Sequence, residues 1–232
     1  MDIPMTVVAR IRSDFPSKFG IPRQSGLVPE LSAQVVFEPE FRNPDILRGL
    51  EGFSHIWLLW NFSANRQSGW SPTVRPPRLG GNARMGVFAT RSPFRPNPIG
   101  LSCVRLEEVR LNTPDGPVLV ISGADLMDGT PIFDIKPYVP YADCQPHAQG
   151  GFTDTVGEFL LKVDFPEHLL ALVPEDRREA LLGVLSHDPR PSYQNDPERV
   201  YGLSFGGYNV RFQVGDGVLT VTEFSPHGHE SH

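Results

Sequence analysis

Of the 232 residues in the chain, 39% are hydrophobic and 21% are charged. This length is enough to bury one large core or two smaller ones. No apolar run approaches the roughly 18 residues of a membrane span, and residues 1–10 lack the basic start and apolar core of a signal peptide, so we expect a cytoplasmic protein. Its two cysteines, Cys103 and Cys144, match no zinc or redox spacing and are expected to be reduced.

The formal net charge of −6 conceals an asymmetry between the two halves of the chain. Residues 1–112 hold 14 Lys and Arg against 9 Asp and Glu, whereas residues 113–232 hold 7 against 18. Residues 66–105 contain no acidic residue or lysine but seven arginines, a stretch that indicates RNA, a nucleotide or a phosphate as partner. Surface arginines paired with distant acids explain the same count. The seven are Arg66, Arg75, Arg78, Arg84, Arg91, Arg95 and Arg105.

The first 140 residues predict many short strands, because runs rich in β-branched and aromatic residues are bounded by Gly, Pro or Asn. Residues 43–50 predict a helix with Asn43 as N-cap and Pro44 at its first position. The almost wholly apolar run at 53–62 predicts a central strand covered on both faces. This pattern favours a closed barrel or a sandwich. The predicted strands are residues 5–12, 33–38, 53–62, 85–90, 101–111, 118–126 and 131–139.

The texture of the sequence changes near residue 150, where residues 147–155 read as a linker. Beyond it we predict a strand within 156–165 and helices between 166 and 190, the second of them starting at Pro174. Residues 208–224 predict a hairpin that turns at Asp216-Gly217. These elements indicate a small α+β second domain.

The stretch RSPFRPNPIG at residues 91–100 predicts a stiff, extended loop, since each proline fixes its own φ and holds the preceding residue away from helix. Arg91 and Arg95 on such a loop suit a planar or anionic ligand met at fixed geometry, although solvated arginines on a surface connection explain them equally well. Gly100 is expected to let the chain turn into the next strand.

A second dense stretch, residues 125–143, combines acids, a lysine and phenols between prolines. Such a set suits a preorganised site, whereas an edge strand with solvated charges is the plainer alternative. Its polar members are Asp125, Asp128, Asp134, Lys136, Tyr138, Tyr141 and Asp143.

Common nucleotide and metal motifs are missing from the sequence. No G-x-G-x-x-G follows a strand, and GNARMG at residues 81–86 is followed by Val87-Phe88 rather than Lys-Ser/Thr, so neither a common NAD site nor a common ATP site is expected. The C-terminal His227, His229 and His232 are expected to form a frayed tail, and no metal site is predicted.

Five motifs in one order closely resemble the TsaA/TrmO family, the bacterial-type tRNA (adenine-N6)-methyltransferases. The resemblance covers most of the chain. It is carried by GIPRQSGL (20–27), RGLEGFSHIWLLW (48–60), VRPPRLGGNARMGVFATRSPFRPNPIGLS (74–102), DGTPIFDIKPYVPYAD (128–143) and DPRPSY (188–193).

The resemblance implies a mainly β fold, with a closed six-stranded, non-Rossmann barrel over residues 5–146 that binds S-adenosyl-L-methionine and works as a homodimer. It also implies methylation of the 6-amino nitrogen of threonylcarbamoyladenosine at position 37 of threonine tRNA. The small α+β domain over 151–232 is expected to position the tRNA, with Arg190 touching phosphate.

The resemblance further implies cofactor contacts. These are Pro22, Arg23, Gln24, Ser63, Ala64, Arg91, the Leu101 backbone, Asp125, Leu126, Met127 and Asp128. Residues 61–65 (NFSAN) depart from the family's His-Gln pair, which leaves Ser63 and Ala64 with backbone contacts.

Methyl transfer to a nitrogen needs alignment and removal of a proton. We expect Asp125, Asp128 and Tyr138 to hold the sulfonium and Asp134 to accept the proton. Arg95 or Lys136 is expected to clamp the carboxylate of the modified base, so that Arg91 faces the cofactor and Arg95 the RNA. Two alternatives stay open: a non-catalytic RNA- or nucleotide-binding barrel, and a hydrolase of phosphorylated small molecules.

Overall fold

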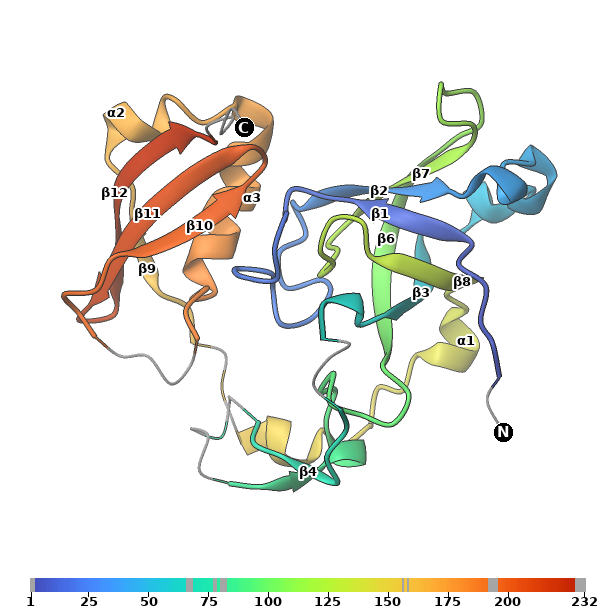
Figure 1. Ribbon diagram of the computed structural model, residues 1–232, viewed down its shortest axis with the longest axis horizontal. Coiled ribbons are helices and arrows are strands. Elements are labelled where there is room, and N and C mark those ends of the chain that lie inside the picture. The colour runs from blue at the N-terminus through green and yellow to red at the C-terminus, as the bar shows by residue number, and fades with distance from the viewer. Residues whose placement is uncertain are drawn as a thin grey trace.

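The structure, a computed structural model, describes residues 3–65, 69–76, 79, 83–155, 157, 159–191 and 196–227. Six antiparallel strands close into a barrel in the order β1-β2-β7-β6-β3-β8 (Figure 1). They are β1 (Ala9–Arg12), β2 (Ser32–Phe37), β3 (His55–Asn61), β6 (Ile99–Arg110), β7 (Val118–Ser122) and β8 (Pro131–Pro137). The expectation of a mainly β fold with a closed six-stranded barrel is confirmed.

Side chains alternate between the inside and the outside of the barrel. On β3, Ile56, Leu58 and Trp60 point into the core, whereas the residues between them are only partly covered. The prediction that this strand is covered on both faces is therefore wrong, because a strand of a closed barrel has a single inner face. The apolar outer residues of β3 lie on the barrel surface.

Short 3₁₀ turns connect β2 to β3 where a helix is predicted at residues 43–50. Asn43 does act as the N-cap, since its side chain accepts a hydrogen bond from the backbone N–H of Asp45 at 3.0 Å. The turn ends early because Gly49 takes a left-handed φ of 88°. The three turns are η1 (Pro39–Phe41), η2 (Pro44–Leu47) and η3 (Leu50–Gly52).

A separate module is inserted between β3 and β6. After η4 (Ser63–Asn65), it pairs β4 (Thr73–Val74) with β5 (Met85–Gly86) and continues into η6 (Val87–Ala89). The predicted strand at 85–90 thus shrinks to two residues. The reason is the 3₁₀ turn, which the backbone N–H of Thr90 closes on the carbonyl of Val87 at 3.2 Å.

The second half of the chain builds a four-stranded sheet in the order β10-β11-β12-β9, reached through α1 (Pro140–Asp143) and η7 (Gly151–Thr155). The predicted hairpin is confirmed, and its turn residues Asp216 and Gly217 take φ values of 50° and 76°. The predicted helix after Pro174 is also confirmed, whereas β10 was not predicted. The elements are β9 (Lys162–Asp164), α2 (Glu167–Leu170), α3 (Glu175–Ser186), β10 (Tyr201–Phe205), β11 (Tyr208–Gly215) and β12 (Val218–Pro226).

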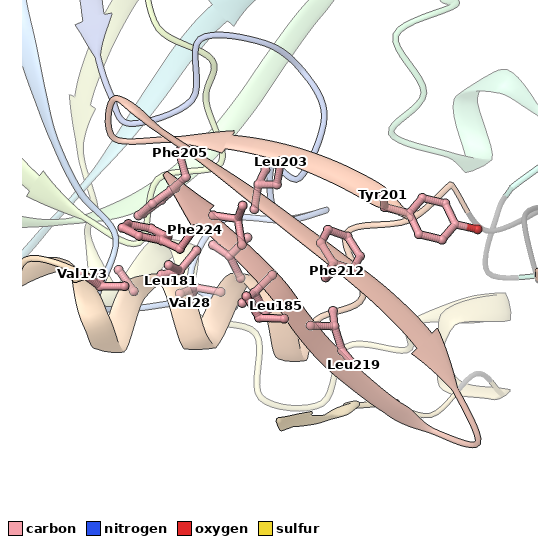
Figure 2. Packing of buried hydrophobic residues seen from close by; sticks show 14 of the residues in the cluster. Val28, Val173, Leu181, Leu185, Tyr201, Leu203, Phe205, Phe212, Leu219 and Phe224 are labelled. Atoms are coloured by element: carbon pink, nitrogen blue, oxygen red, sulfur yellow. The ribbon is translucent and has the colours of Figure 1, made fainter. Parts of the chain in front are cut away.

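The four-stranded sheet is not covered by its own segment alone. Phe15, Val28 and Leu31, from the connection between β1 and β2, belong to the buried cluster of α3 and the second sheet. Figure 2 shows Val28 against α3, among Leu181, Leu185 and the strand residues. The approach is so close that a Cβ on Gly183 would lie 2.7 Å from Val28 Cγ1. The β1–β2 connection is therefore a structural part of the second sheet.

Polar contacts fasten the same junction. The backbone N–H of Gly206 donates to the carbonyl of Asp14 at 2.8 Å, and the Arg177 guanidinium donates to the carbonyl of Gly206. Arg177 also pairs with the Asp14 carboxylate at 3.4 Å. Burial raises the pKa of Asp14, and Arg177 opposes that rise.

No helix in the described ranges is long and apolar enough to cross a membrane.

Candidate active site

A pocket of about 400 Å³ opens at one end of the barrel, where β3 ends and β6 begins. Four stretches that are distant in the sequence line it. The lining residues are Lys18, Ile21, Pro22, Arg23 and Gln24; Trp60, Asn61, Phe62, Ser63 and Ala64; Thr90, Arg91, Arg95, Ile99, Gly100 and Leu101; and Asp125, Met127 and Thr130. This volume and mixed lining suit a small organic ligand.

A chain of hydrogen bonds holds the Asp125 carboxylate in this pocket. The indole N–H of Trp60 donates to the Ser102 hydroxyl at 3.0 Å, and that hydroxyl donates to Asp125 Oδ1 at 2.6 Å. An indole nitrogen can only donate, so the serine proton is directed to the carboxylate. The chain therefore fixes the orientation of Asp125 from inside the barrel.

Asp125 has a raised pKa, mainly because of burial. The Ser102 hydroxyl, backbone N–H groups and the charge of Arg91 oppose the rise. A carboxylate in this position is stabilised by a cationic ligand, whose charge would compensate for the hydration that burial removes. The pocket thus suits a guest that carries positive charge.

Asn61 presents a second polar group that lacks a partner. Its Oδ1 is buried and accepts no hydrogen bond from any described residue. A buried acceptor of this kind suits an N–H or O–H donor on a ligand. The sequence did not single out Asn61, although it begins the NFSAN stretch from which Ser63 and Ala64 were chosen.

The PRQ turn and the RSPFR loop meet beside the pocket. Arg91 Nη1 donates to Gln24 Oε1, which joins two segments 67 positions apart. Arg95 is partly buried and donates to the carbonyl of Thr90 at 3.0 Å, so it braces its own loop. Both arginines line the same pocket.

Gly100 serves close packing rather than a turn. It lies within β6, where a Cβ would stand 2.2 Å from Trp60 Cε2. The expectation that Gly100 turns the chain into the next strand is therefore wrong. Its missing side chain makes room for the indole that donates to Ser102.

Most of the predicted cofactor contacts come together in this pocket. Pro22, Arg23, Gln24, Ser63, Ala64, Arg91, Leu101, Asp125 and Met127 line it, as does Arg95. Leu126 and Asp128 do not. The Leu126 side chain is buried in the barrel core, and the Asp128 carboxylate accepts the backbone N–H of Ser13 at 3.0 Å.

Of the other predicted catalytic residues, Asp134 and Lys136 lie on the outer face of β8, and Tyr138 directly follows the end of that strand. Asp134 and Lys136 form an ion pair at 2.8 Å, with side chains 46% and 63% exposed. Tyr138 packs near Trp57, with ring centroids 5.9 Å apart. None of the three lines the pocket, so their catalytic roles stay predictions.

The predicted phosphate contact of Arg190 does not match its surroundings. Its side chain is 11% exposed and pairs with Asp188 through two nitrogens, at 2.8 and 2.9 Å. Asp188 itself takes a left-handed φ of 51° to meet it. Arg190 braces the DPR turn beside a cavity of about 580 Å³ that the 18–23 segment also lines, and Ser192 and Tyr193 lie outside the described residues.

No group of three or more His, Cys, Asp and Glu side chains gathers to hold a metal among the described residues. Both cysteines are free thiols. His229 and His232 fall outside the described part of the chain.

The fold and the pocket together define a two-part β-barrel protein with a small-molecule pocket at one end of its barrel. The sequence model of the tRNA-methyltransferase O N-terminal domain matches residues 10–144, and the model of the TrmO C-terminal domain matches residues 159–227. The chain therefore belongs to the tRNA-methyltransferase O family.

Relatives extend the match along nearly the whole chain. The tRNA (adenine(37)-N6)-methyltransferase of Escherichia coli K12 is 43% identical over 224 residues, which are 93% of this chain and 95% of that protein. The enzyme of the same name from Eikenella corrodens is 46% identical over 73% of this chain and 95% of its own length. The crystal structure of TrmO from Pseudomonas aeruginosa superimposes with a TM-score of 0.76 at 33% identity, and covers 97% of this chain and all of that one.

Proposed function

We propose that this protein transfers a methyl group from S-adenosylmethionine to the 6-amino nitrogen of the adenosine at position 37 of tRNA. The observation that carries the proposal is the 43% identity to the Escherichia coli tRNA (adenine(37)-N6)-methyltransferase over nearly the full length of both chains. A relative from Pseudomonas aeruginosa, 41% identical over 88% of this chain, is named a putative S-adenosylmethionine-dependent methyltransferase. We infer from this reaction that the protein works in the cytoplasm, beside its tRNA.

The pocket at the barrel end fits the cofactor in chemistry. Asp125 offers a carboxylate to a cationic group, and Asn61 Oδ1 offers an unused acceptor. Trp60 and Phe62 pack edge to face at 4.4 Å between centroids and present aromatic surface beside them. When bound, S-adenosylmethionine supplies an electrophilic methyl group on positively charged sulfur.

Asp134 is our proposal for the group that takes the proton from the target nitrogen. Paired residues of neighbouring strands share a face, and Leu59 pairs with both Leu101 and Asp134. Asp134 thus lies about 10 Å, two strand spacings, from the pocket residue Leu101 along the outer face. An adenine ring lying over Leu59 would reach both Leu101 and Asp134.

More specifically, we propose that the adenosine methylated is threonylcarbamoyladenosine in threonine tRNA. Its carboxylate needs a cationic partner, and Arg95 at the pocket or Lys136 beside Asp134 offers one. An adenosine without this group would lose that charge pairing and would be a poor substrate.

The working form that we propose is a homodimer. Leu101 is 51% exposed on the outer face of β6, next to the partly covered Leu59 and Trp57 of β3. Burying this apolar strip would bring a second chain beside Asp134. Light scattering of the purified protein tests it, and a monomer at micromolar concentration would count against it.

One experiment tests the reaction. The protein is incubated with S-adenosylmethionine and threonine tRNA with or without threonylcarbamoylation. The tRNA is then digested, and the masses of the nucleosides are measured by mass spectrometry. We expect a gain of one methyl on the modified adenosine and little on the plain one. Cofactor and tRNA binding without any methyl gain would instead support a non-catalytic RNA-binding barrel.

A further inference from the structure

A large groove lies next to the cofactor pocket. It has a volume of about 1260 Å³ and shares Arg23, Gln24, Phe62, Thr90 and Arg91 with the pocket. Its walls come from the inserted β4–β5 module and from the linker around Phe152. Figure 1 shows this module, labelled at β4, at the end of the molecule where the linker also passes.

The groove is cationic in a protein of net negative charge. Its described lining holds four arginines, Arg23, Arg75, Arg84 and Arg91, and no aspartate or glutamate. None of the four forms an ion pair with a carboxylate among the described residues. By contrast, Arg105 of the same sequence stretch pairs with Glu107 at 3.1 Å outside the groove, while Arg66 and Arg78 lie outside the described residues.

An aromatic side chain stands in the groove without cover. Phe88 is 79% exposed, whereas its neighbour Val87 is 3% exposed. Backbone bonds fix the turn that carries both, since the Val87 N–H donates to the Pro72 carbonyl at 3.0 Å. The fold therefore holds Phe88 out to solvent at a defined position, where its ring is ready to stack on a planar group.

The module itself is braced. The Ser71 N–H donates to the Phe94 carbonyl at 3.3 Å, and Arg84 Nη1 donates to the Thr73 hydroxyl at 3.3 Å. The first contact joins the module to the RSPFR loop that lines the pocket, and the second ties the two sides of the β4–β5 pair to each other. The arginines of the groove are thus held in a fixed relation to the pocket.

We propose that this groove binds the single-stranded nucleotides that flank the target adenosine, with Arg75 and Arg84 on backbone phosphates and Phe88 stacked on a neighbouring base. The inference rests on the proposed function. Unpaired arginines alternating with an exposed aromatic ring, in a groove continuous with a cofactor pocket, match single-stranded RNA. An acidic protein segment would match the charge but leave the ring without a planar partner.

The test measures tRNA and cofactor separately in the full-length protein. Binding of fluorescently labelled, threonylcarbamoylated threonine tRNA is followed by anisotropy over about 50 to 200 mM salt. Binding of S-adenosylmethionine is followed by calorimetry, and methylation by KM and kcat. The variants are Arg75→Ala, Arg84→Ala, Phe88→Ala, Phe88→Leu and Phe88→Tyr, with Arg48→Ala and Leu172→Ala as exposed controls away from the groove.

We expect each arginine variant to weaken tRNA binding and to lower the salt slope by about 0.7. Phe88→Ala and Phe88→Leu should weaken it by about 5- to 100-fold, whereas Phe88→Tyr should retain it. In these weakened variants the KM for tRNA should rise, whereas kcat and the affinity for the cofactor should stay unchanged. Both control variants should match the wild type.

Three results would overturn the inference in distinguishable ways. If the wild type methylates the tRNA but Arg75→Ala, Arg84→Ala and Phe88→Ala keep its KM within about twofold, the groove serves another partner, such as an acidic protein segment. If Phe88→Leu binds like the wild type, stacking is excluded. If the wild type neither binds nor methylates the tRNA, the proposed function fails and the groove proposal fails with it.

Discussion

The hydroxyl oxygen of Ser102 lies 2.6 Å from Oδ1 of Asp125 and receives the indole N–H of Trp60 from its other side. Ser102 is buried on the inner face of β6, whereas Asp125 lines the pocket, so this pair connects the barrel core to the candidate cofactor site. The contact lowers the pKa of Asp125 against the larger rise that burial causes. Substitution of Ser102 should therefore change the properties of the pocket, although Ser102 itself lies in the barrel core.

The first prediction concerns pH. Asp125 must be ionised to hold a cationic cofactor, so the affinity for S-adenosylmethionine should fall as the pH drops through the raised pKa of this group. Ser102→Ala removes a contact that lowers this pKa, and the loss of affinity should move to higher pH. Calorimetry across a pH series measures both profiles.

Asp125→Asn is the matched control for that series, because it keeps the shape but not the charge. Its affinity should be weak and nearly independent of pH. A raised carboxyl pKa also means that Asp125 stabilises the cofactor-free fold only at low pH and loses that contribution as the pH rises through its pKa. The cofactor-free Asp125→Asn protein should therefore melt no lower than the wild type at pH 7, and an unchanged pH profile of cofactor binding would contradict the assignment.

The second prediction separates Arg91 from Arg95. Arg91 is exposed at the pocket and bonded to Gln24, so Arg91→Ala should weaken cofactor binding by about tenfold or more. Arg95→Ala should leave cofactor binding within about twofold and reduce kcat/KM for tRNA. Calorimetry and steady-state kinetics on both variants check this, and the reverse pattern would exchange the two roles.

The third prediction tests the packing of Gly100. In Gly100→Ala the new methyl group collides with the Trp60 ring, so we expect destabilisation of about 1–3 kcal/mol and loss of the Trp60–Ser102 hydrogen bond. Denaturant unfolding measures the stability, and tryptophan fluorescence reports the displaced indole. Gly202→Ala is the matched control, since Gly202 also lies in a strand but a Cβ there meets nothing within 4 Å. Equal stability of the two variants would refute the steric account.

The fourth prediction concerns the junction of the two sheets. Arg177→Ala leaves the Gly206 carbonyl and the Asp14 carboxylate without their guanidinium partner, at about 1–3 kcal/mol. Without Arg177 the pKa of Asp14 rises further, so this variant should lose more stability at pH 7 than at pH 4. Thermal melts at both pH values show the difference, and adding Asp14→Asn should recover part of it at pH 7.

Local signals in the sequence predicted those parts of the fold that local physics determines. The Asp216-Gly217 turn and the Asn43 cap follow from short-range backbone chemistry, and both are present. The predicted strand at 85–90 fails because a hydrogen bond to the Pro72 carbonyl, fifteen positions away, holds Val87 at the start of a turn. Such contacts leave no periodic pattern in the sequence.

The candidate pocket illustrates the same limit. Its four lining stretches were assembled through the family resemblance, because no spacing rule connects Gln24 with Arg91. Asn61 and Ser102 were missed, since a single polar residue in an apolar strand reads as an ordinary surface position until the register of the barrel is known. Gly100 was misread because only the Trp60 ring, forty positions earlier, explains it.

The residence of Phe15, Val28 and Leu31 in the core of the second sheet has a consequence for biosynthesis. These residues leave the ribosome early, whereas α3, β10, β11 and β12, which cover them, all lie in the last quarter of the chain. The β1–β2 connection must therefore wait, uncovered, for nearly the whole chain to be made. Nascent chains stalled before residue 201 should be cleaved by protease within residues 13–31, and release of the full chain should close that window.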